Sequence, residues 1–169
     1  ERKVELVDAI RDLVLEDEGM TRMTSNMNED DVRTVLKHPI SMVGTDSSSI
    51  DGLPKSPFVA QHPRTFSSFP RILGKYIREE KLLPLEEAIR KMTSYPAQRM
   101  KITDRGLLRP GFWADITVFN TETVNEIATF AEPCKYPVGI EYVLVNGTIS
   151  VEKGELTKAL AGKVLKLGK

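Results

Sequence analysis

The stretch Ile40-Ser-Met-Val-Gly-Thr-Asp46 decides how the fold of this chain is interpreted, because its short apolar run ends on an acidic residue. Pro39 precedes this stretch, and a polar run that begins at Ser47 follows it. Residues 40–43 are therefore predicted to form a strand. Parallel β/α barrels carry their catalytic residues at the C-terminal ends of their strands, so Asp46 stands where such a fold places an active-site carboxylate.

Helical patterns lie on both sides of this predicted strand. Apolar residues recur at three- and four-residue spacing in residues 4–14 and 32–37, which predicts a helix in each range. Asn28 is expected to cap the second of these helices. Further helices are predicted to start at Pro70 and after Pro84, and a short one is predicted at residues 97–100. The order of helix, strand and helix is typical of α/β proteins with a parallel sheet.

The pattern changes near Asp104. Residues 114–119 alternate between apolar and polar types, and two β-branched runs at 141–145 and 148–151 flank the dipeptide Asn146-Gly147. Asn-Gly is the preferred turn of a two-residue β-hairpin. We therefore predict an α/β part at residues 1–104 and a small β unit at residues 105–169. The long stretch at residues 47–66 is predicted to be a loop, of a length that is unusual unless it is functional.

Composition narrows the kinds of partner. Lys+Arg and Asp+Glu balance at 24 each, so bulk charge gives no reason to expect binding to nucleic acid or to an anionic membrane. The sequence has no apolar run near the roughly 20 residues that span a bilayer. Cys134 is the single cysteine, which excludes an internal disulfide and a Cys-x-x-Cys zinc site. A cytoplasmic location is the simplest expectation.

The length of the chain limits the fold. A complete eight-fold β/α barrel needs roughly 250 residues, whereas this chain has 169 residues and begins at Glu1. We therefore expect the sequence to be part of a longer polypeptide. A mature chain that has lost a leader is the alternative.

Six sequence blocks occur in a fixed order along the chain. They are Met42-Val-Gly-Thr-Asp-Ser47, His62-Pro-Arg64, Phe69-Pro-Arg-Ile-Leu-Gly74, Leu85-Glu-Glu-Ala-Ile-Arg-Lys-Met-Thr93, Gly106-Leu-Leu-Arg-Pro-Gly-Phe-Trp-Ala-Asp-Ile-Thr-Val-Phe119 and Gly139-Ile-Glu-Tyr-Val-Leu-Val-Asn-Gly147. Together they resemble the D-aminoacylase branch (N-acyl-D-amino-acid deacylases) of the amidohydrolase superfamily. The last two blocks occur widely in amidohydrolases, whereas the His-Pro-Arg and Phe-Pro-Arg blocks after the Gly-Thr-Asp strand point to this branch.

The resemblance implies a fold and a reaction. The fold would be the C-terminal part of a metal-dependent β/α barrel, followed by strands of a small β-sandwich domain. The reaction would be zinc-dependent hydrolysis of the linear amide of an N-acyl-D-amino acid, which releases a carboxylic acid and a D-amino acid.

The resemblance also assigns roles to Asp46, Arg64 and His62, and Ser47 is added as a candidate because it follows Asp46 at a position where some relatives have glycine. Asp46 would take a proton from the metal-bound water, return it to the leaving nitrogen and serve as a weak metal ligand. Arg64 would bind the α-carboxylate of the substrate through its guanidinium fork, while His62 would line the pocket and Ser47 would orient Asp46. The alternatives are structural: Asp46 as a turn or cap residue, and Arg64 as an exposed loop arginine.

The metal ligands of such an enzyme are incomplete in this sequence. The chain has two histidines, and they do not form a His-x-His pair. A catalytic zinc takes three protein ligands plus water, which Asp46 alone does not supply. We therefore predict that this chain by itself binds no zinc tightly and has no amidase activity. Its partner would be the missing N-terminal part of the barrel or a second copy of the chain.

Two other functions stay open. The first is a non-catalytic interaction module, derived from an amidohydrolase, that pairs through exposed strand edges. The second is a cyclic amidase of the hydantoinase or dihydroorotase kind. The His-Pro-Arg block argues against the second, because an arginine for a free carboxylate suits a linear N-acyl amino acid better.

Overall fold

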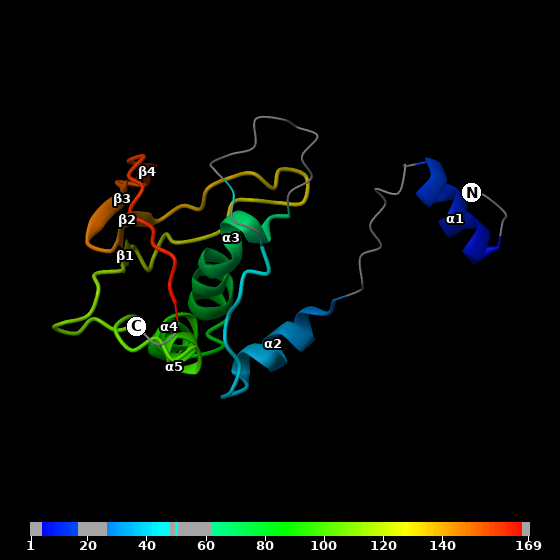
Figure 1. Cartoon of the computed structure of the whole chain (residues 1–169). Coiled ribbons are helices and arrows are strands. Elements are labelled where there is room, and N and C mark those ends of the chain that lie inside the picture. Colours follow the sequence, from blue (N-terminus) through cyan, green and yellow to red (C-terminus); the bar gives the residue numbers. More distant parts are fainter. Residues whose placement is uncertain (1–4, 17–26, 48–49, 51–61, 167–169) are drawn as a thin grey trace. The chain divides into compact units, whose positions relative to one another are not determined.

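The computed structural model describes residues 5–16, 27–47, 50 and 62–166 of the chain (Figure 1). The chain divides into two compact units, residues 1–32 and 33–169, which are described separately. In the first unit, α1 (Leu6–Glu16) confirms the helix predicted at the start of the sequence. Asp8 and Arg11 pair across one turn of this helix at 2.9 Å.

Helix α2 (Glu29–Lys37) is also confirmed, together with its predicted cap. The backbone N–H of Asp30 donates to Oδ1 of Asn28 at 2.8 Å, which satisfies one of the backbone donors that every helix start leaves without an internal partner. In the second unit, both oxygens of the Glu80 carboxylate accept hydrogen bonds from Arg33, at 2.8 and 2.9 Å. This two-point contact fixes residue 33 against the chain at residue 80.

The helix start predicted at Pro70 is wrong. Helix α3 (Arg64–Arg71) begins six residues earlier, directly after Pro63, and continues into the π-helix η1 (Ile72–Glu79). Figure 1 shows α3 and η1 as one continuous green helix. A proline inside a helix removes one backbone hydrogen bond, and α3 nevertheless continues past Pro70 into η1. The predicted loop at residues 47–66 therefore ends at residue 63, and most of it lies outside the described residues.

Two short helices complete the helical part of this unit. Helix α4 (Leu85–Met92) starts after Pro84 as predicted, and α5 (Ser94–Arg99) starts three residues before the predicted position. The most buried apolar side chains come from η1, α4, α5 and the segment after β1, and they form the core. They are Ile72, Leu73, Tyr76, Ala88, Ala97, Val124 and Ala128.

The strand predicted at residues 40–43 is not formed in the described part of the chain. Residues 41–47 are not assigned to a helix or a strand, although their burial alternates residue by residue, as it does in a strand. The backbone N–H of Val43 donates to the carbonyl of Lys91 at 3.2 Å, so this part of the segment bonds to the C-terminal end of α4. A strand needs a neighbouring strand to complete its ladder, and no described strand lies against residues 41–47.

A four-stranded antiparallel sheet follows, in the order β1-β2-β3-β4. Strands β1 (Ile116–Phe119), β2 (Ile140–Val145) and β3 (Thr148–Glu152) confirm the predicted strands. At the predicted turn, Asn146 and Gly147 both have positive φ angles, 50° and 81°, as a type I′ hairpin turn requires. Strand β4 (Glu155–Leu156) was not predicted. It follows a second turn with positive φ, at Lys153 (51°) and Gly154 (82°).

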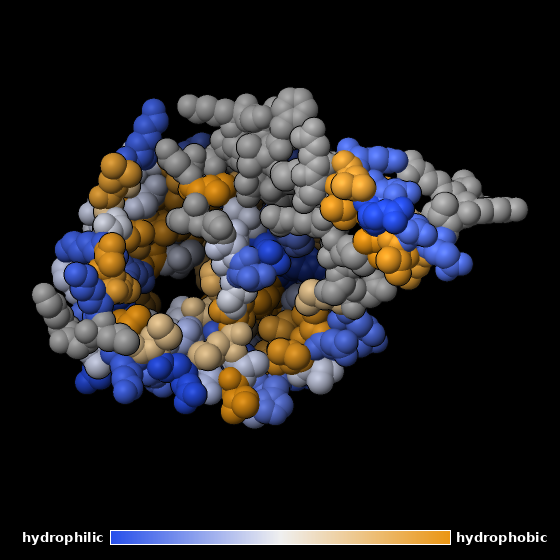
Figure 2. All heavy atoms as spheres, turned by 45° about the vertical axis from the view of Figure 1, so that its right-hand side comes forward, coloured by the Kyte–Doolittle hydropathy of each residue, from blue (hydrophilic) through white to orange (hydrophobic). Residues whose placement is uncertain are grey.

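The described residues thus combine helices with a small antiparallel sheet. The β/α barrel, the β-sandwich and the boundary near residue 104 stay predictions. Apolar residues reach the surface at several separate places on the face shown in Figure 2, and hydrophilic residues lie between them. None of the described helices has both the length and the apolar character that are needed to cross a membrane.

Candidate active site

Asp46 lies at the end of the extended segment and faces Arg64. Its φ angle is positive, 48°, a left-handed conformation that aspartate adopts more readily than most residues. Its carboxylate Oδ2 is 2.8 Å from Nη1 of Arg64, and the Asp46 side chain is 85% exposed. Arg64 is the first residue of α3. The structure therefore brings together the two residues to which the sequence assigned the main chemistry.

His62 lies beside Arg64. Its ring nitrogen Nδ1 accepts a hydrogen bond from the backbone N–H of Arg64 at 3.1 Å. Burial lowers the pKa of His62, the positive charge of Arg64 lowers it further, and the negative charge of Asp46 acts in the opposite direction. The lowered pKa favours a neutral imidazole at neutral pH, and a neutral ring can accept through Nδ1.

Ser47 joins the extended segment to the start of α3. Its hydroxyl Oγ lies 2.7 Å from Oγ1 of Thr65, at hydrogen-bond distance. We call Asp46, Ser47, His62 and Arg64 the Asp46 cluster. Its members come from two segments that a long stretch of sequence separates, so the cluster is a tertiary feature. The orienting role that was predicted for Ser47 stays a prediction.

Two aromatic residues from a third segment pack beside this cluster, and neither was predicted. The ring of Phe130 meets the ring of His62 edge to face, with the centroids 5.0 Å apart. The ring of Tyr136 meets the ring of Phe66 in α3 in the same arrangement, with the centroids 5.6 Å apart. Edge-to-face contact is a preferred arrangement of aromatic pairs. No local sequence signal marks Phe130 or Tyr136, because these contacts join residues that are far apart in the chain.

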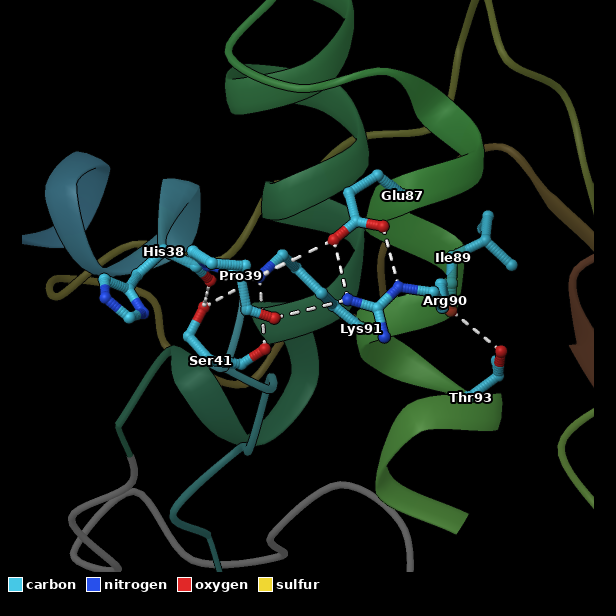
Figure 3. Close-up of polar contacts among 8 residues, drawn as sticks. All are labelled: His38, Pro39, Ser41, Glu87, Ile89, Arg90, Lys91 and Thr93. Atoms are coloured by element: carbon cyan, nitrogen blue, oxygen red, sulfur yellow. Dashed lines mark hydrogen bonds and ion pairs between the residues drawn. The ribbon is translucent and has the colours of Figure 1, made fainter. Parts of the chain in front are cut away.

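A buried lysine holds the start of the extended segment (Figure 3). Lys91 of α4 is 1% exposed. Its Nζ donates to the backbone carbonyl of His38 at 2.5 Å, and to the carbonyl and hydroxyl of Ser41 at 3.2 and 3.0 Å. The neighbouring Arg90 donates to the carbonyl of Pro39 at 3.3 Å and pairs with Glu87. These contacts fix the chain a few residues before Asp46.

The described residues do not supply a complete zinc site. They contain no group of three His, Cys, Asp or Glu side chains that is placed to hold a metal ion. The Asp46 cluster offers one carboxylate and one imidazole, fewer than the three protein ligands of a catalytic zinc. The ligand set present therefore does not fit a zinc ion without further residues.

Comparison with known proteins identifies the family. Residues 4–151 match the sequence model of the Amidohydrolase family. This chain belongs to the amidohydrolase family.

Three similar proteins that match at least 72% of this chain are deacylases of the D-aminoacylase branch, as the sequence predicted. The chain is 46% identical to an N-acyl-D-glutamate deacylase of Alcaligenes xylosoxydans xylosoxydans over 121 residues. These aligned residues make up 72% of this chain and 23% of that protein. The chain is 40% identical over 139 residues to a D-aminoacylase of the same organism, over 82% of this chain and 27% of that protein. The chain thus spans about a quarter of the length of the curated relatives that it matches.

A solved structure supports the same relationship. A crystal structure of D-aminoacylase, described as defining a novel subset of amidohydrolases, matches with a TM-score of 0.72 and 40% identity, over 82% of this chain and 28% of that chain. This match supports an amidohydrolase fold for the chain.

Proposed function

We propose that the protein containing this chain hydrolyses the linear amide bond of N-acyl-D-amino acids and releases a carboxylic acid and a D-amino acid. The observation that carries the proposal is the 2.8 Å contact between the exposed carboxylate of Asp46 and Arg64. In this proposal the Asp46 carboxylate is the proton acceptor, and the Arg64 guanidinium beside it binds the substrate carboxylate. In an N-acyl amino acid the α-carboxylate and the amide nitrogen are attached to the same carbon, so the group that Arg64 would bind and the atom that Asp46 would protonate lie close together.

Asp46 would act as the general base and then as the general acid. Its exposed carboxylate accepts a proton from the attacking water while the water oxygen bonds to the amide carbon. The same proton then goes to the amide nitrogen as the carbon–nitrogen bond breaks. A positioned carboxylate that transfers a proton in this way typically increases the reaction rate by about 10²–10⁴-fold.

Arg64 would bind the α-carboxylate of the substrate. A guanidinium carries five N–H donors and pairs with a carboxylate through two parallel hydrogen bonds. Nη1 of Arg64 contacts Asp46, so a substrate held by the same fork lies against the catalytic carboxylate. His62 would line this place, and Ser47 would help to fix Asp46 through its contact with Thr65.

The relatives suggest the missing part of the site. A similar solved structure is an N-acyl-D-glutamate deacylase from Bordetella bronchiseptica, described as complexed with zinc and a phosphonate inhibitor, with a TM-score of 0.66, 41% identity and coverage of 80% of this chain and 28% of that chain. The described residues contain no group of three side chains that could hold a metal ion. Zinc binding in the complete protein would therefore depend on residues outside them. These would come from an N-terminal part of the barrel or from a second copy of the chain. A cytoplasmic location remains part of the proposal.

The test uses the natural protein that contains these residues, with N-acetyl-D-methionine as substrate. Asp46→Asn should lower kcat by about 10²–10⁴ while zinc content, measured by elemental analysis, stays unchanged. Arg64→Ala should raise KM at least ten- to a hundredfold, because even one hydrogen bond to a charged group contributes about 1.5–3 kcal/mol. Arg64→Lys, which keeps the charge but not the fork, is the matched control and should recover only part of this loss.

Two outcomes would contradict the proposal. Full turnover by the Asp46→Asn protein would remove the acid–base role, and an unchanged KM in Arg64→Ala would remove the carboxylate clamp. The 169-residue chain should be assayed in parallel. Stoichiometric zinc with D-selective turnover in that chain would refute the prediction that its site is incomplete.

A further inference from the structure

Phe130 is an exposed aromatic side chain at the edge of the Asp46 cluster. Its side chain is 80% exposed, yet one edge is held against the ring of His62, with an angle of 85° between the ring planes. Single exposed apolar residues are common on protein surfaces. Phe130 differs from these residues because it contacts His62, a member of the Asp46 cluster.

The chain around Phe130 has a fixed backbone. The N–H of Thr129 donates to the carbonyl of Glu132 at 3.1 Å, and the N–H of Glu132 donates to Oγ1 of Thr129 at 3.0 Å. These reciprocal hydrogen bonds close a turn with Phe130 inside it. Six residues farther on, Tyr136 packs on Phe66 of α3. The turn is therefore closed by its own hydrogen bonds and anchored to α3 on its C-terminal side.

A short path of contacts leads from this ring to the proposed reaction centre. The Phe130 ring contacts the His62 ring, the His62 Nδ1 accepts from the backbone of Arg64, and the Arg64 guanidinium pairs with Asp46. The ring is thus connected to the cluster through His62, the neighbour of Arg64. In an N-acyl amino acid the side chain branches from the carbon that carries the carboxylate, whereas the acyl group lies beyond the amide nitrogen.

We propose that Phe130 forms an apolar wall against the side chain of the bound D-amino acid and makes the protein prefer large apolar side chains to small ones. This inference rests on the proposed function. A carboxylate held by Arg64 brings the first atoms of the side chain toward His62 and Phe130. Burial of apolar surface against an aromatic ring then favours leucine or methionine over alanine.

The experiment measures selectivity in the natural protein that contains these residues. The quantity is the ratio of kcat/KM for N-acetyl-D-leucine to that for N-acetyl-D-alanine. Phe130→Ala should lower this ratio about tenfold, which is the range that a few methylene contacts give in an apolar pocket. Phe130→Leu, which keeps an apolar side chain, should lower it less. Leu108→Ala is the matched control, because Leu108 is also exposed (81%) and lies outside the cluster; it should leave the ratio unchanged.

A second substrate series separates the side chain from the acyl group. The ratio of kcat/KM for N-butyryl- to N-formyl-D-leucine should be the same in the Phe130→Ala protein and in the unmodified protein. If this acyl ratio changes and the side-chain ratio does not, the wall faces the acyl group and the assignment is overturned. If both ratios are unchanged while the melting temperature falls in both Phe130 variants, the ring has a packing role and the inference is refuted.

Failure of the proposed function gives a different result. In that case the unmodified protein cleaves no N-acyl-D-amino acid, which refutes the proposed function and the role of Phe130 together. Hydrolysis by the unmodified protein with an unchanged side-chain ratio in Phe130→Ala refutes the role of Phe130 alone.

Discussion

Replacement of Lys91 by methionine removes a buried ammonium and keeps a side chain of similar length. Three hydrogen bonds to the chain at His38 and Ser41 are lost. At about 1.5 kcal/mol for each bond, the lower end of the range for charged groups, the loss is about 4.5 kcal/mol. Burying methionine costs less free energy than burying an ammonium, and this difference offsets part of the lost stability. We therefore expect the free energy of unfolding to fall by about 2–3 kcal/mol.

The assay is equilibrium unfolding in urea, followed by the fluorescence of Trp113, the chain's single tryptophan. The midpoint should move to lower urea with an unchanged slope, as a loss of stability without a change in exposed surface requires. The melting temperature should fall by roughly 5–10 °C, given about 2–4 °C per kcal/mol for a chain of this size.

The control for this substitution is Lys37→Met, at an exposed position at the end of α2. It should change stability by less than about 0.5 kcal/mol. A loss below about 1 kcal/mol for Lys91→Met, or an equal loss for both variants, would show that the hydrogen bonds of Lys91 do not hold the extended segment.

Three further outcomes are expected. Arg64→Ala should raise the pKa of His62 toward its ordinary value, as followed by NMR titration of the imidazole, because the charge of Arg64 lowers that pKa; an unchanged titration would contradict this electrostatic contact. Since the unfolded chain binds this proton more tightly, the part of the stability that is due to His62 should fall as pH drops below about 6.5 and should not fall in His62→Gln. Gly139→Ala should cost about 2–4 kcal/mol in the urea assay, because φ is 76° and the new Cβ would lie 2.4 Å from the nitrogen of Val124. Gly111→Ala has a similar φ of 87° and open space around it, so a cost as large as that of Gly139→Ala would refute the steric argument.

Local chemistry explains which elements could be predicted from the sequence. The cap at Asn28 and the turn at Asn146-Gly147 depend on neighbouring residues, and both were predicted correctly. The start of α4 after Pro84 has the same local origin. The predicted strand at residues 40–43 failed because pairing needs another strand, and no local pattern shows whether that strand is present.

The candidate site shows the same division. Asp46, His62 and Arg64 were singled out because their motifs resemble those of a family, and the structure places them together. Their roles remain predictions. Lys91 and Phe130 were missed because their contacts reach residues dozens of positions away. A lysine on an amphipathic helix is ordinarily exposed, so its burial is visible only once the partner segment is in place.

The turn between β2 and β3 has a consequence for the chemical ageing of the protein. Asparagine followed by glycine is prone to deamidation, because the glycine nitrogen can attack the side-chain carbonyl carbon and release ammonia. In the folded chain the nitrogen of Gly147 donates to the carbonyl of Ala114 at 2.9 Å. The Asn146 amide accepts from Arg105 at 2.5 Å and donates to the carbonyl of Ala161 at 2.6 Å. Both reacting groups are thus held by other partners.

Unfolding would release both groups at once. The products, aspartate and isoaspartate at position 146, would place a second carboxylate near Asp115, whose Oδ1 accepts from the backbone N–H of residue 146 at 2.8 Å. They would also lose the donor to Ala161. The covalent lifetime of this dipeptide therefore depends on how long the hairpin stays folded, and each molecule that deamidates refolds less well than before.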